Sequence, residues 1–149
     1  MEYSLRKALP GDRERIGELF REMLRSIYHT PEAKGYEEGY LDKFFAGGED
    51  RICVALDGET VIAYLSAEVY RVPEPYLYLD DLSVTESYRN RGVGTALIRE
   101  AEAYGRGIGV PRVLLHVEKS NGDALRLYER LGYRVHRDDG ARWLMHREL

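Results

Sequence analysis

The sequence has 149 residues, of which 44% are hydrophobic and 32% are charged, a composition typical of a folded globular chain rather than a disordered one. A chain of this length predicts a single domain that covers residues 1–149. The formal net charge of −4 disfavours a general nucleic-acid binder, because neutralising phosphates needs a basic surface, and it favours a cationic partner.

Cysteine and histidine usage limits the metal and redox chemistry. Cys53 is the only cysteine, which excludes an internal disulfide and any metal cluster built on cysteines. His29, His136 and His146 show no spacing typical of metal ligands. The first residues lack the apolar core of a signal peptide, and no later stretch approaches the roughly 20 apolar residues of a membrane span. The sequence therefore predicts a cytoplasmic protein with no metal and no membrane partner.

The first third of the chain predicts a strand and two helices. Residues 3–8 fit a short strand, and Asp12, after a Pro-Gly turn, fits a helix N-cap. A weaker pattern over residues 35–46, closed by two glycines, predicts the second helix. The first helix is amphipathic, because its apolar residues recur at helical spacing. These are Ile16, Leu19, Phe20, Met23, Leu24 and Ile27.

The middle of the chain predicts three strands. Residues 51–56 and 60–72 flank Asp57-Gly58-Glu59, which is typical of a hairpin turn. Two prolines then end the second strand, and a third strand covers residues 76–84.

The strand at residues 76–84 changes its apolar phase. Leu77 and Leu79 share one parity, whereas Leu82 and Val84 share the other. Since side chains alternate with a period of two, burying both pairs requires one extra residue. We therefore expect a β-bulge near Asp80–Leu82.

The last third alternates helices and strands. Residues 94–104 predict a helix, residues 112–118 a strand, and residues 121–131 a helix that a glycine ends. Residues 133–136 and 141–147 predict an antiparallel pair around an Asp-Asp-Gly turn. The fold class is therefore α/β or α+β with a mixed sheet.

A glycine-rich turn joins the third strand to the following helix. Its sequence is Ser87-Tyr88-Arg89-Asn90-Arg91-Gly92-Val93-Gly94-Thr95. Successive amides at the positive end of a helix suit phosphate oxygens, and the two arginines add positive charge. The alternative is a plain turn in which the glycines serve only backbone geometry. A dinucleotide fingerprint and a Walker loop both fail, because the third glycine and the Gly-Lys pair that they require are absent.

The segment Arg89-Asn90-Arg91-Gly92-Val93-Gly94 resembles the Arg/Gln-x-x-Gly-x-Gly/Ala motif of the GNAT N-acetyltransferases. Residues 79–84 are similar to the bulged fourth strand of that family. Residues 121–133 are similar to its Asn-x-x-Ala-x-x-x-Tyr-x-x-x-Gly-Phe/Tyr segment. The opening residues 5–12 also resemble the family's amino-terminal pattern, so the resemblance covers nearly the whole chain.

The resemblance implies a central mixed, mostly antiparallel sheet of about seven strands flanked by about four helices. It also implies acetyl-CoA as cosubstrate, with the pyrophosphate at the glycine-rich turn and the pantetheine beside the bulged strand. The cofactor-binding residues that it implies are Leu82, Ser83, Val84, Arg89, Asn90, Arg91, Gly92, Val93, Gly94, Thr95, Asn121, Ala124 and Tyr128.

Two of these residues also have ordinary structural explanations. The family's tyrosine faces the CoA sulfur, which implies that Tyr128 protonates the leaving thiolate. However, Ala124, Leu127, Tyr128 and Leu131 form a helical stripe that is equally typical of a core. Asn121 is implied to bind pantetheine, and it is also a natural helix N-cap.

The base that deprotonates the amine has several candidates. His116 and Glu118 have the opposite parity to the apolar residues of their strand, so His116 can face a cleft. Many relatives that act on protein N-termini carry an acidic residue at this position. Asp81, Asp80 and a water relay are therefore alternatives, and an exposed histidine at a strand end is another explanation.

The predicted function is transfer of an acetyl group from acetyl-CoA to a primary amine by direct attack. The alternatives are a GNAT-like regulatory or sensor domain that binds acyl-CoA with little turnover, and a nucleotide-binding module. A small cationic amine or a peptide amine suits the aromatic and acidic residues expected to face the acceptor. These are Tyr28, Tyr36, Tyr40, Tyr64, Tyr70, Tyr76, Tyr78, Glu37, Glu38, Glu68, Asp80 and Asp81. Family members often dimerise, so a homodimer is an assembly to test.

Overall fold

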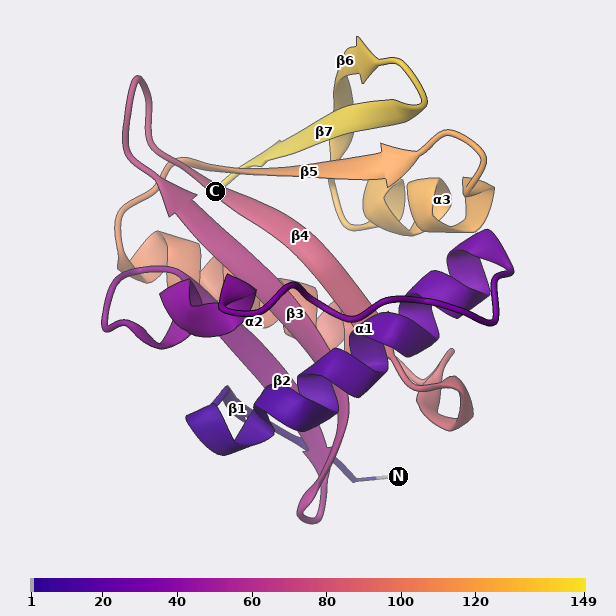
Figure 1. The fold of residues 1–149 in the computed structure, drawn as a ribbon. Coiled ribbons are helices and arrows are strands. Elements are labelled where there is room, and N and C mark those ends of the chain that lie inside the picture. Colours follow the sequence, from indigo (N-terminus) through magenta and orange to yellow (C-terminus); the bar gives the residue numbers. More distant parts are fainter. Residues whose placement is uncertain (1) are drawn as a thin grey trace. The chain divides into compact units, whose positions relative to one another are not determined.

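The structure is a computed structural model, and it describes residues 2–149 (Figure 1). Seven strands form one sheet in the order β1-β2-β3-β4-β5-β7-β6. The strands are β1 (Ser4–Lys7), β2 (Arg51–Asp57), β3 (Thr60–Tyr70), β4 (Tyr76–Val84), β5 (Arg112–Glu118), β6 (Arg134–Asp139) and β7 (Arg142–Glu148). Because β4 and β5 pair in parallel and the β1–β2, β2–β3, β5–β7 and β6–β7 pairs are antiparallel, the expected mixed sheet is confirmed.

Helices connect these strands. The α-helices are α1 (Arg13–Tyr28), α2 (Val93–Gly107) and α3 (Gly122–Arg130). The 3-10 helices are η1 (Pro10–Asp12), η2 (Tyr40–Phe45) and η3 (Glu86–Tyr88). Of the four expected helices, three are therefore α-helical and the fourth is the short η2. None of the helices in residues 2–149 has both the length and the apolar character to cross a membrane.

The chain divides into two compact units, each built from two stretches of sequence. The first unit contains the chain up to residue 67 together with residues 81–101, and the second contains residues 68–80 and 102–149. The single domain expected from chain length stays a prediction.

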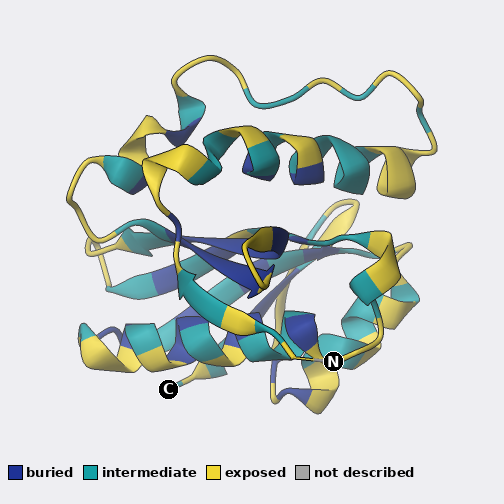
Figure 2. Cartoon of the chain, turned by 90° about the horizontal axis from the view of Figure 1, so that it is seen from below, coloured by how far each residue is buried: buried dark blue, intermediate teal, exposed yellow. Residues whose placement is uncertain are grey.

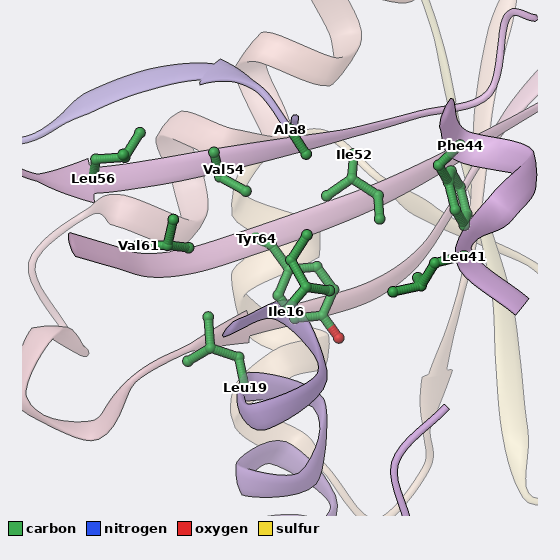
Figure 3. Packing of buried hydrophobic residues seen from close by; sticks show 10 residues of the cluster. All are labelled: Ala8, Ile16, Leu19, Leu41, Phe44, Ile52, Val54, Leu56, Val61 and Tyr64. Carbon is green, nitrogen blue, oxygen red and sulfur yellow. The ribbon is translucent and has the colours of Figure 1, made fainter. Parts of the chain in front are cut away.

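The core of the first unit lies between α1 and the strands β1 to β3. Ile16 and Leu19 of α1 are fully buried and pack beside Tyr64 of β3, as Figure 3 shows. The exposed residues of α1 face away from the strands (Figure 2). Replacing Leu19 by alanine is expected to destabilise the fold by about 2–5 kcal/mol, because a cavity remains.

Residues 35–46 differ from the sequence-based prediction, because only Tyr40–Phe45 is helical and it is a 3-10 helix. Gly39 has a φ of 80°, a left-handed conformation that an α-helix does not contain. Tyr36 instead stacks between Phe20 and Tyr40, with ring centroids 3.9 and 4.9 Å away. Aromatic stacking, rather than the expected α-helix, therefore holds this segment in place.

The change of apolar phase in β4 is confirmed by its contacts with α2. Leu77 lies 3.5 Å from a Cβ placed on Gly105, and Leu82 and Val84 lie 3.7 and 3.9 Å from one placed on Gly94. Leu77, Leu79 and Ser83 are buried on one parity, while Leu82 and Val84 stay partly exposed. Ser83 is tolerated in the interior because its hydroxyl donates a hydrogen bond of 2.9 Å to the carbonyl of Leu19. Ser83 has the parity of Leu77 but contacts α1 rather than α2, so the parity of the strand reverses between these two residues, as a bulge near Asp80–Leu82 requires.

The second unit is built on β5, β7 and β6, which lie side by side in Figure 1. Val113, Leu115 and Val117 of β5 are buried and alternate with partly exposed residues, as the sequence predicted. The β6–β7 pair contains an irregularity between Val135 and Arg137, where one extra residue enters β6. The sequence did not predict this β-bulge.

Candidate functional site

The glycine-rich turn of the first unit forms a concave row of backbone amides. Asn90 and Gly92 have φ angles of 61° and 82°, so the chain alternates into the left-handed region twice within three residues. The first backbone bond of α2 runs from the amide of Ala96 to the carbonyl of Gly92, at 3.0 Å. The preceding amides of α2 have no partner within the helix and are available to an anion. The phosphate site itself stays a prediction.

The first turn of α2 packs closely on the end of β4. A Cβ placed on Gly94 would lie 3.7 Å from Leu82 and 3.9 Å from Val84. These are ordinary van der Waals contacts, so a methyl group fits there and a branched side chain has little room. A Cβ on Gly92 would meet nothing within 4 Å, although its positive φ disfavours other residues.

A cavity of about 170 Å³ opens beside the same end of β4. It is lined by four of the predicted cofactor-binding residues together with three residues of α1. The seven residues are Met23, Ser26, Ile27, Leu82, Ser83, Val84 and Arg89. The structure thus adds one wall, from the carboxyl-terminal half of α1, that sequence reasoning missed.

The two arginines of the turn have different surroundings. Arg89 donates a hydrogen bond of 2.8 Å from Nε to the carbonyl of Val84, and its Nη2 lies 3.5 Å from Glu22. Arg91 is exposed and lies 5.8 Å from the centroid of the Tyr88 ring. Arg89 therefore ties the turn to β4, whereas the Arg91 guanidinium remains at the surface of the cradle.

Asp81 belongs to a hydrogen-bonded cluster of side chains in the first unit. The Tyr36 hydroxyl donates to Oδ2 of Asp81 at 2.6 Å and lies 2.7 Å from the hydroxyl of Tyr64. Burial, and then the neighbouring Tyr64 and Asp81, raise the pKa of Tyr36 well above its usual range. Tyr36 is thus a neutral donor at physiological pH, and Asp81 is engaged by the segment before η2.

His116 of the second unit lies between two polar partners. Its Nδ1 is 2.7 Å from the hydroxyl of Tyr78 on β4, and its Nε2 is 2.8 Å from Oδ2 of Asp139 at the end of β6. Hydrogen bonds from Arg137, and then from His116, hold the pKa of Asp139 well below its usual range. The exposed-histidine explanation is therefore wrong, because both ring nitrogens are occupied.

The charge of Asp139 fixes the tautomer of a neutral His116. An ionised carboxylate can only accept, so Nε2 must carry the proton that faces Asp139. The unprotonated Nδ1 then accepts from the Tyr78 hydroxyl. This arrangement leaves the histidine able to take one more proton at Nδ1, which is the requirement for a general base.

The predicted residues of α3 are also in the second unit. The side chain of Asn121 accepts from the amide of Ala124 at 3.1 Å, so the N-cap explanation for Asn121 is confirmed. Tyr128 packs edge-on against Tyr133 with centroids 5.8 Å apart. Burial raises the pKa of Tyr128 to about 12, so its phenol keeps the proton at neutral pH.

Metal-binding clusters and a second cavity were also considered as candidate sites. Within residues 2–149, no three His, Cys, Asp or Glu side chains come together in a way that could hold a metal ion. A second cavity, of about 290 Å³, lies between α1 and the segment up to Leu41 and contains none of the predicted catalytic or cofactor-binding residues.

Comparison with protein families gives a match to the acetyltransferase (GNAT) family over residues 18–133. The chain belongs to this family. The GNAT match covers the cradle, the His116 strand and the Tyr128 helix, so the resemblance inferred from the three motifs is confirmed.

Solved structures show the same fold. The chain is similar to PaiA N-acetyltransferase from Thermoplasma acidophilum in complex with coenzyme A, at 20% identity and a TM-score of 0.83, covering 100% of both chains. It is also similar to Arabidopsis thaliana NAA60 in complex with a bisubstrate analogue, at 26% identity and a TM-score of 0.78, covering 99% of this chain and 98% of that chain.

Curated relatives are matched over different shares of their length. The chain is 28% identical to streptothricin acetyltransferase from Streptomyces lavendulae over 155 aligned positions, covering 88% of this chain and 81% of the relative. It is 45% identical over 62 residues to histone acetyltransferase MCC1 from Arabidopsis thaliana, covering 41% of this chain. The matched part spans only 25% of MCC1 and 44% of a mycothiol acetyltransferase from Corynebacterium efficiens.

Sequence reasoning missed Tyr78 and Asp139 as partners of His116. Tyr78 could have been found, because its pairing opposite Leu114 follows from aligning two parallel strands that both precede helices. No sequence pattern predicts the contact of Asp139 with His116, because the face on which Asp139 lies depends on the unpredicted extra residue in β6. The apolar wall from α1 was not predicted, because Met23 and Ile27 belong to the apolar stripe of an amphipathic helix, a pattern that is typical of core packing.

Proposed function

We propose that this GNAT protein is an acetyl-CoA-dependent N-acetyltransferase that acts on a primary amine by direct attack. The observation that carries the proposal is the amide cradle at the start of α2, with Asn90 and Gly92 in left-handed conformations inside the family motif. Streptothricin acetyltransferase, a relative matched over 81% of its length, acetylates streptothricin, as its name indicates.

The cradle suits the phosphates of acetyl-CoA. The unpaired amides of Val93, Gly94 and Thr95 would donate to phosphate oxygens, and the positive end of α2 favours negative charge. Arg89 and Arg91 of the motif are the proposed accompanying cations, and Arg89 also bonds the Val84 carbonyl and lies near Glu22. When bound, acetyl-CoA supplies the acetyl thioester, and backbone groups near Leu82 would bond its carbonyl oxygen.

His116 is the proposed base. A primary amine with a reference pKa of about 10.4 is mostly protonated at neutral pH, so a proton must leave before attack. The amine proton would pass to the Tyr78 oxygen, directly or through water, as the Tyr78 proton passes to Nδ1 of His116. The resulting imidazolium would be balanced by Asp139. Asp81 is the alternative base, although Tyr36 already donates to its carboxylate.

Tyr128 is the proposed acid for the leaving thiolate. Its phenol holds a proton up to high pH, since burial raises its pKa to about 12. Asn121 and Ala124, at the start of the same helix, are the proposed pantetheine contacts, in addition to the capping bond between them.

The acceptor is proposed to be a cationic amine, small or peptidic, because the net charge is −4 and acidic residues stand near the candidate base. A cytoplasmic location and a homodimer remain predictions. The family match is the same whichever amine is the acceptor. A panel of substrates is therefore needed to discriminate among the candidate amines.

The test is incubation with acetyl-CoA and a panel of acceptors, following free thiol and product mass. The panel should contain lysine, spermidine, a peptide with a free N-terminus, and a neutral alcohol as control. Turnover of at least one amine, inhibited by rising salt for cationic acceptors, is expected. Tight binding of acetyl-CoA without turnover of any amine would instead support the regulatory domain. Acetylation of the alcohol alone would exclude an N-acetyltransferase.

A further inference from the structure

Asp139 stands at the end of β6, and its carboxylate serves two basic side chains at once. Oδ2 lies 2.8 Å from Nε2 of His116 and 3.1 Å from Nη2 of Arg137, while Oδ1 lies 2.6 Å from Nε of Arg137. His116 and Asp139 have side-chain exposures of 17% and 23%, so their contact is partly screened from water. The negative charge of Asp139 is therefore divided between a histidine and an arginine.

The β-bulge in β6 determines which face of the sheet Asp139 occupies. Before the bulge, Arg134 pairs with His146 and Val135 with Met145; after it, Arg137 pairs with Leu144 and Asp139 with Arg142. The extra residue is His136, whose ring lies 4.7 Å from that of His146. One additional residue reverses the parity of every side chain that follows it.

The pairing of β5 with β7 places His116 on the same face. His116 is directly opposite Leu144, and Glu118 is opposite Arg142. Residues directly opposite one another in a sheet share a face. His116, Leu144 and Arg137 therefore form one row, and Glu118, Arg142 and Asp139 form the next. If β6 ran without the bulge, His136 would be opposite Leu144 and Asp138 rather than Asp139 would be opposite Arg142, so Asp139 would occupy the far face.

The geometry points to Asp139 as a positioning residue for His116, turned onto the histidine's face by the extra residue in β6 and held partly neutralised by Arg137. This role rests on the proposed function, in which His116 accepts the proton of the amine. Asp139 touches neither reacting group in that scheme, so it acts through the imidazole.

Two effects of Asp139 follow from elementary electrostatics. Accepting from Nε2 fixes the neutral tautomer and leaves Nδ1 as the acceptor. A carboxylate beside the ring also favours the imidazolium that forms when the proton arrives. Arg137 opposes the second effect, both by its own positive charge and by occupying the same carboxylate oxygens. Removing Asp139 and removing Arg137 should therefore shift the protonation of His116 in opposite directions.

The other groups around His116 do not produce this pair of opposite shifts. Tyr78 faces it from β4, Leu144 is opposite it on β7, and Arg142 and His146 flank Leu144 on the same face. Glu118 is on the same face of β5. The α3 helix also packs against β5; its Asp123 and Arg126 are paired with each other, and Tyr128 holds its proton up to high pH.

The experiment is an NMR titration of the imidazoles in the full chain, without ligand. The sequence has four histidines, and His116→Gln assigns the relevant signal. Asp139→Asn is expected to lower the midpoint pH of the His116 titration by about one unit, and Arg137→Gln to raise it by about half a unit. The matched control is Asp138→Asn, which removes the same charge one residue away.

Asp138 suits this control because it is opposite Trp143 on the other face of the hairpin and is paired with Lys119. Its replacement should leave the His116 midpoint within about 0.2 units of the wild type. Equal shifts for Asp138→Asn and Asp139→Asn, or shifts of the same sign for Asp139→Asn and Arg137→Gln, would overturn the positioning role. Should Asp139→Asn unfold, the sign of the Arg137→Gln shift still decides.

Kinetics with the best acceptor of the amine panel separate this inference from the proposed function. The rising limb of kcat/KM against pH should move with the NMR midpoint in each variant, and kcat should fall about 10- to 100-fold in Asp139→Asn as the imidazole loses its orientation. Asp139→Glu should recover part of that loss. If no amine is acetylated, the proposed function fails, while the NMR shifts still decide whether Asp139 and Arg137 control His116.

Discussion

The glycine-rich turn and the His116 cluster are built in opposite ways. The proposed phosphate site of the turn uses the backbone amides of three consecutive residues, Val93 to Thr95, and the shape of the turn follows from left-handed conformations at Asn90 and Gly92. The cluster uses the side chains of Tyr78, His116 and Asp139, which come from three different strands. A motif can encode the first kind of site, whereas only strand pairing creates the second.

This difference also separates the effects that mutations should have. A backbone site tolerates side-chain changes until one of them fills the space that the ligand needs. A side-chain site fails when a single polar atom is removed, often with little change in folding.

Replacing Tyr128 by phenylalanine tests the side-chain site most directly. The ring and its packing against Tyr133 are retained, while the proposed proton donor is lost. We expect the single-turnover rate to fall about 10²- to 10⁴-fold, with acetyl-CoA affinity within a few-fold of the wild type. In the wild type, ionisation of Tyr128 should cause no fall in rate below about pH 10, because its pKa is about 12.

Tyr133→Phe is the matched control for that variant. The Tyr133 hydroxyl donates to the buried Glu102 at 2.8 Å, so its removal should lower stability and leave the single-turnover rate nearly unchanged. Unaltered single-turnover chemistry in Tyr128→Phe would return Tyr128 to a purely structural role and leave solvent as the proton source.

Gly94→Val tests the backbone site. The branched side chain would crowd Leu82 and Val84 and displace phosphate from the amides, and one charge-assisted hydrogen bond contributes about 1.5–3 kcal/mol. We therefore expect calorimetry to show acetyl-CoA affinity reduced about 10- to 100-fold. Gly94→Ala should lose no more than a few-fold, because its methyl group meets only ordinary contacts. Unchanged affinity in Gly94→Val would place acetyl-CoA elsewhere.

Tyr36→Phe asks whether the first unit also depends on a side-chain cluster. The hydroxyl bonds to Asp81 and contacts that of Tyr64, so its loss removes hydrogen bonds from a part-buried cluster and should reduce the free energy of unfolding by about 1–3 kcal/mol. Tyr88→Phe removes a hydroxyl whose partner, Asp57, is exposed, and should change stability by at most about 0.5 kcal/mol. Urea unfolding distinguishes the two; equal losses would contradict a special role for Tyr36.

The smallest expected effect concerns Asp12 at the start of α1. The hydrogen bond from Arg6, and then that from the Leu9 amide, lower the pKa of Asp12. Because the folded pKa is below the unfolded value of about 3.9, this stabilisation is present above that pH and is lost as the pH falls through the folded value. Asp12→Asn should therefore reduce stability by at most about 1 kcal/mol at pH 7, with the difference shrinking below about pH 4. A difference that is independent of pH would indicate that the Asp12 charge contributes nothing.

The α1 amino terminus and η2 show how local sequence can mislead. Asp12 occupies the N-cap position as predicted, but its carboxylate bonds to Arg6 and the Leu9 amide, and α1 has no side-chain cap. The helix expected over residues 35–46 is replaced by aromatic stacking of Tyr36 and by η2. In both cases contacts outside the segment outweigh its local preference.

The strand β4 shows the limit of hydrophobic parity. Its bounds were predicted to the residue, as were those of β5, because both are dense in β-branched and aliphatic side chains. Parity did not predict the burial of Ser83, because that burial depends on a hydrogen bond to Leu19, a residue far away in the chain. Polar burial depends on a partner that parity cannot reveal.

The sequence by itself determined the family, the order of nearly all strands and helices, and the place of the glycine-rich turn before α2, because those features depend on short-range spacing and on glycine conformations within one turn. Only the tertiary structure decided the partners of His116, the engagement of Asp81 by Tyr36, and the apolar wall that α1 adds beside β4. Each of these depends on which strands pair and in which register. The bulge at His136 changes the face on which Asp139 lies, and no sequence pattern within β6 predicts this bulge.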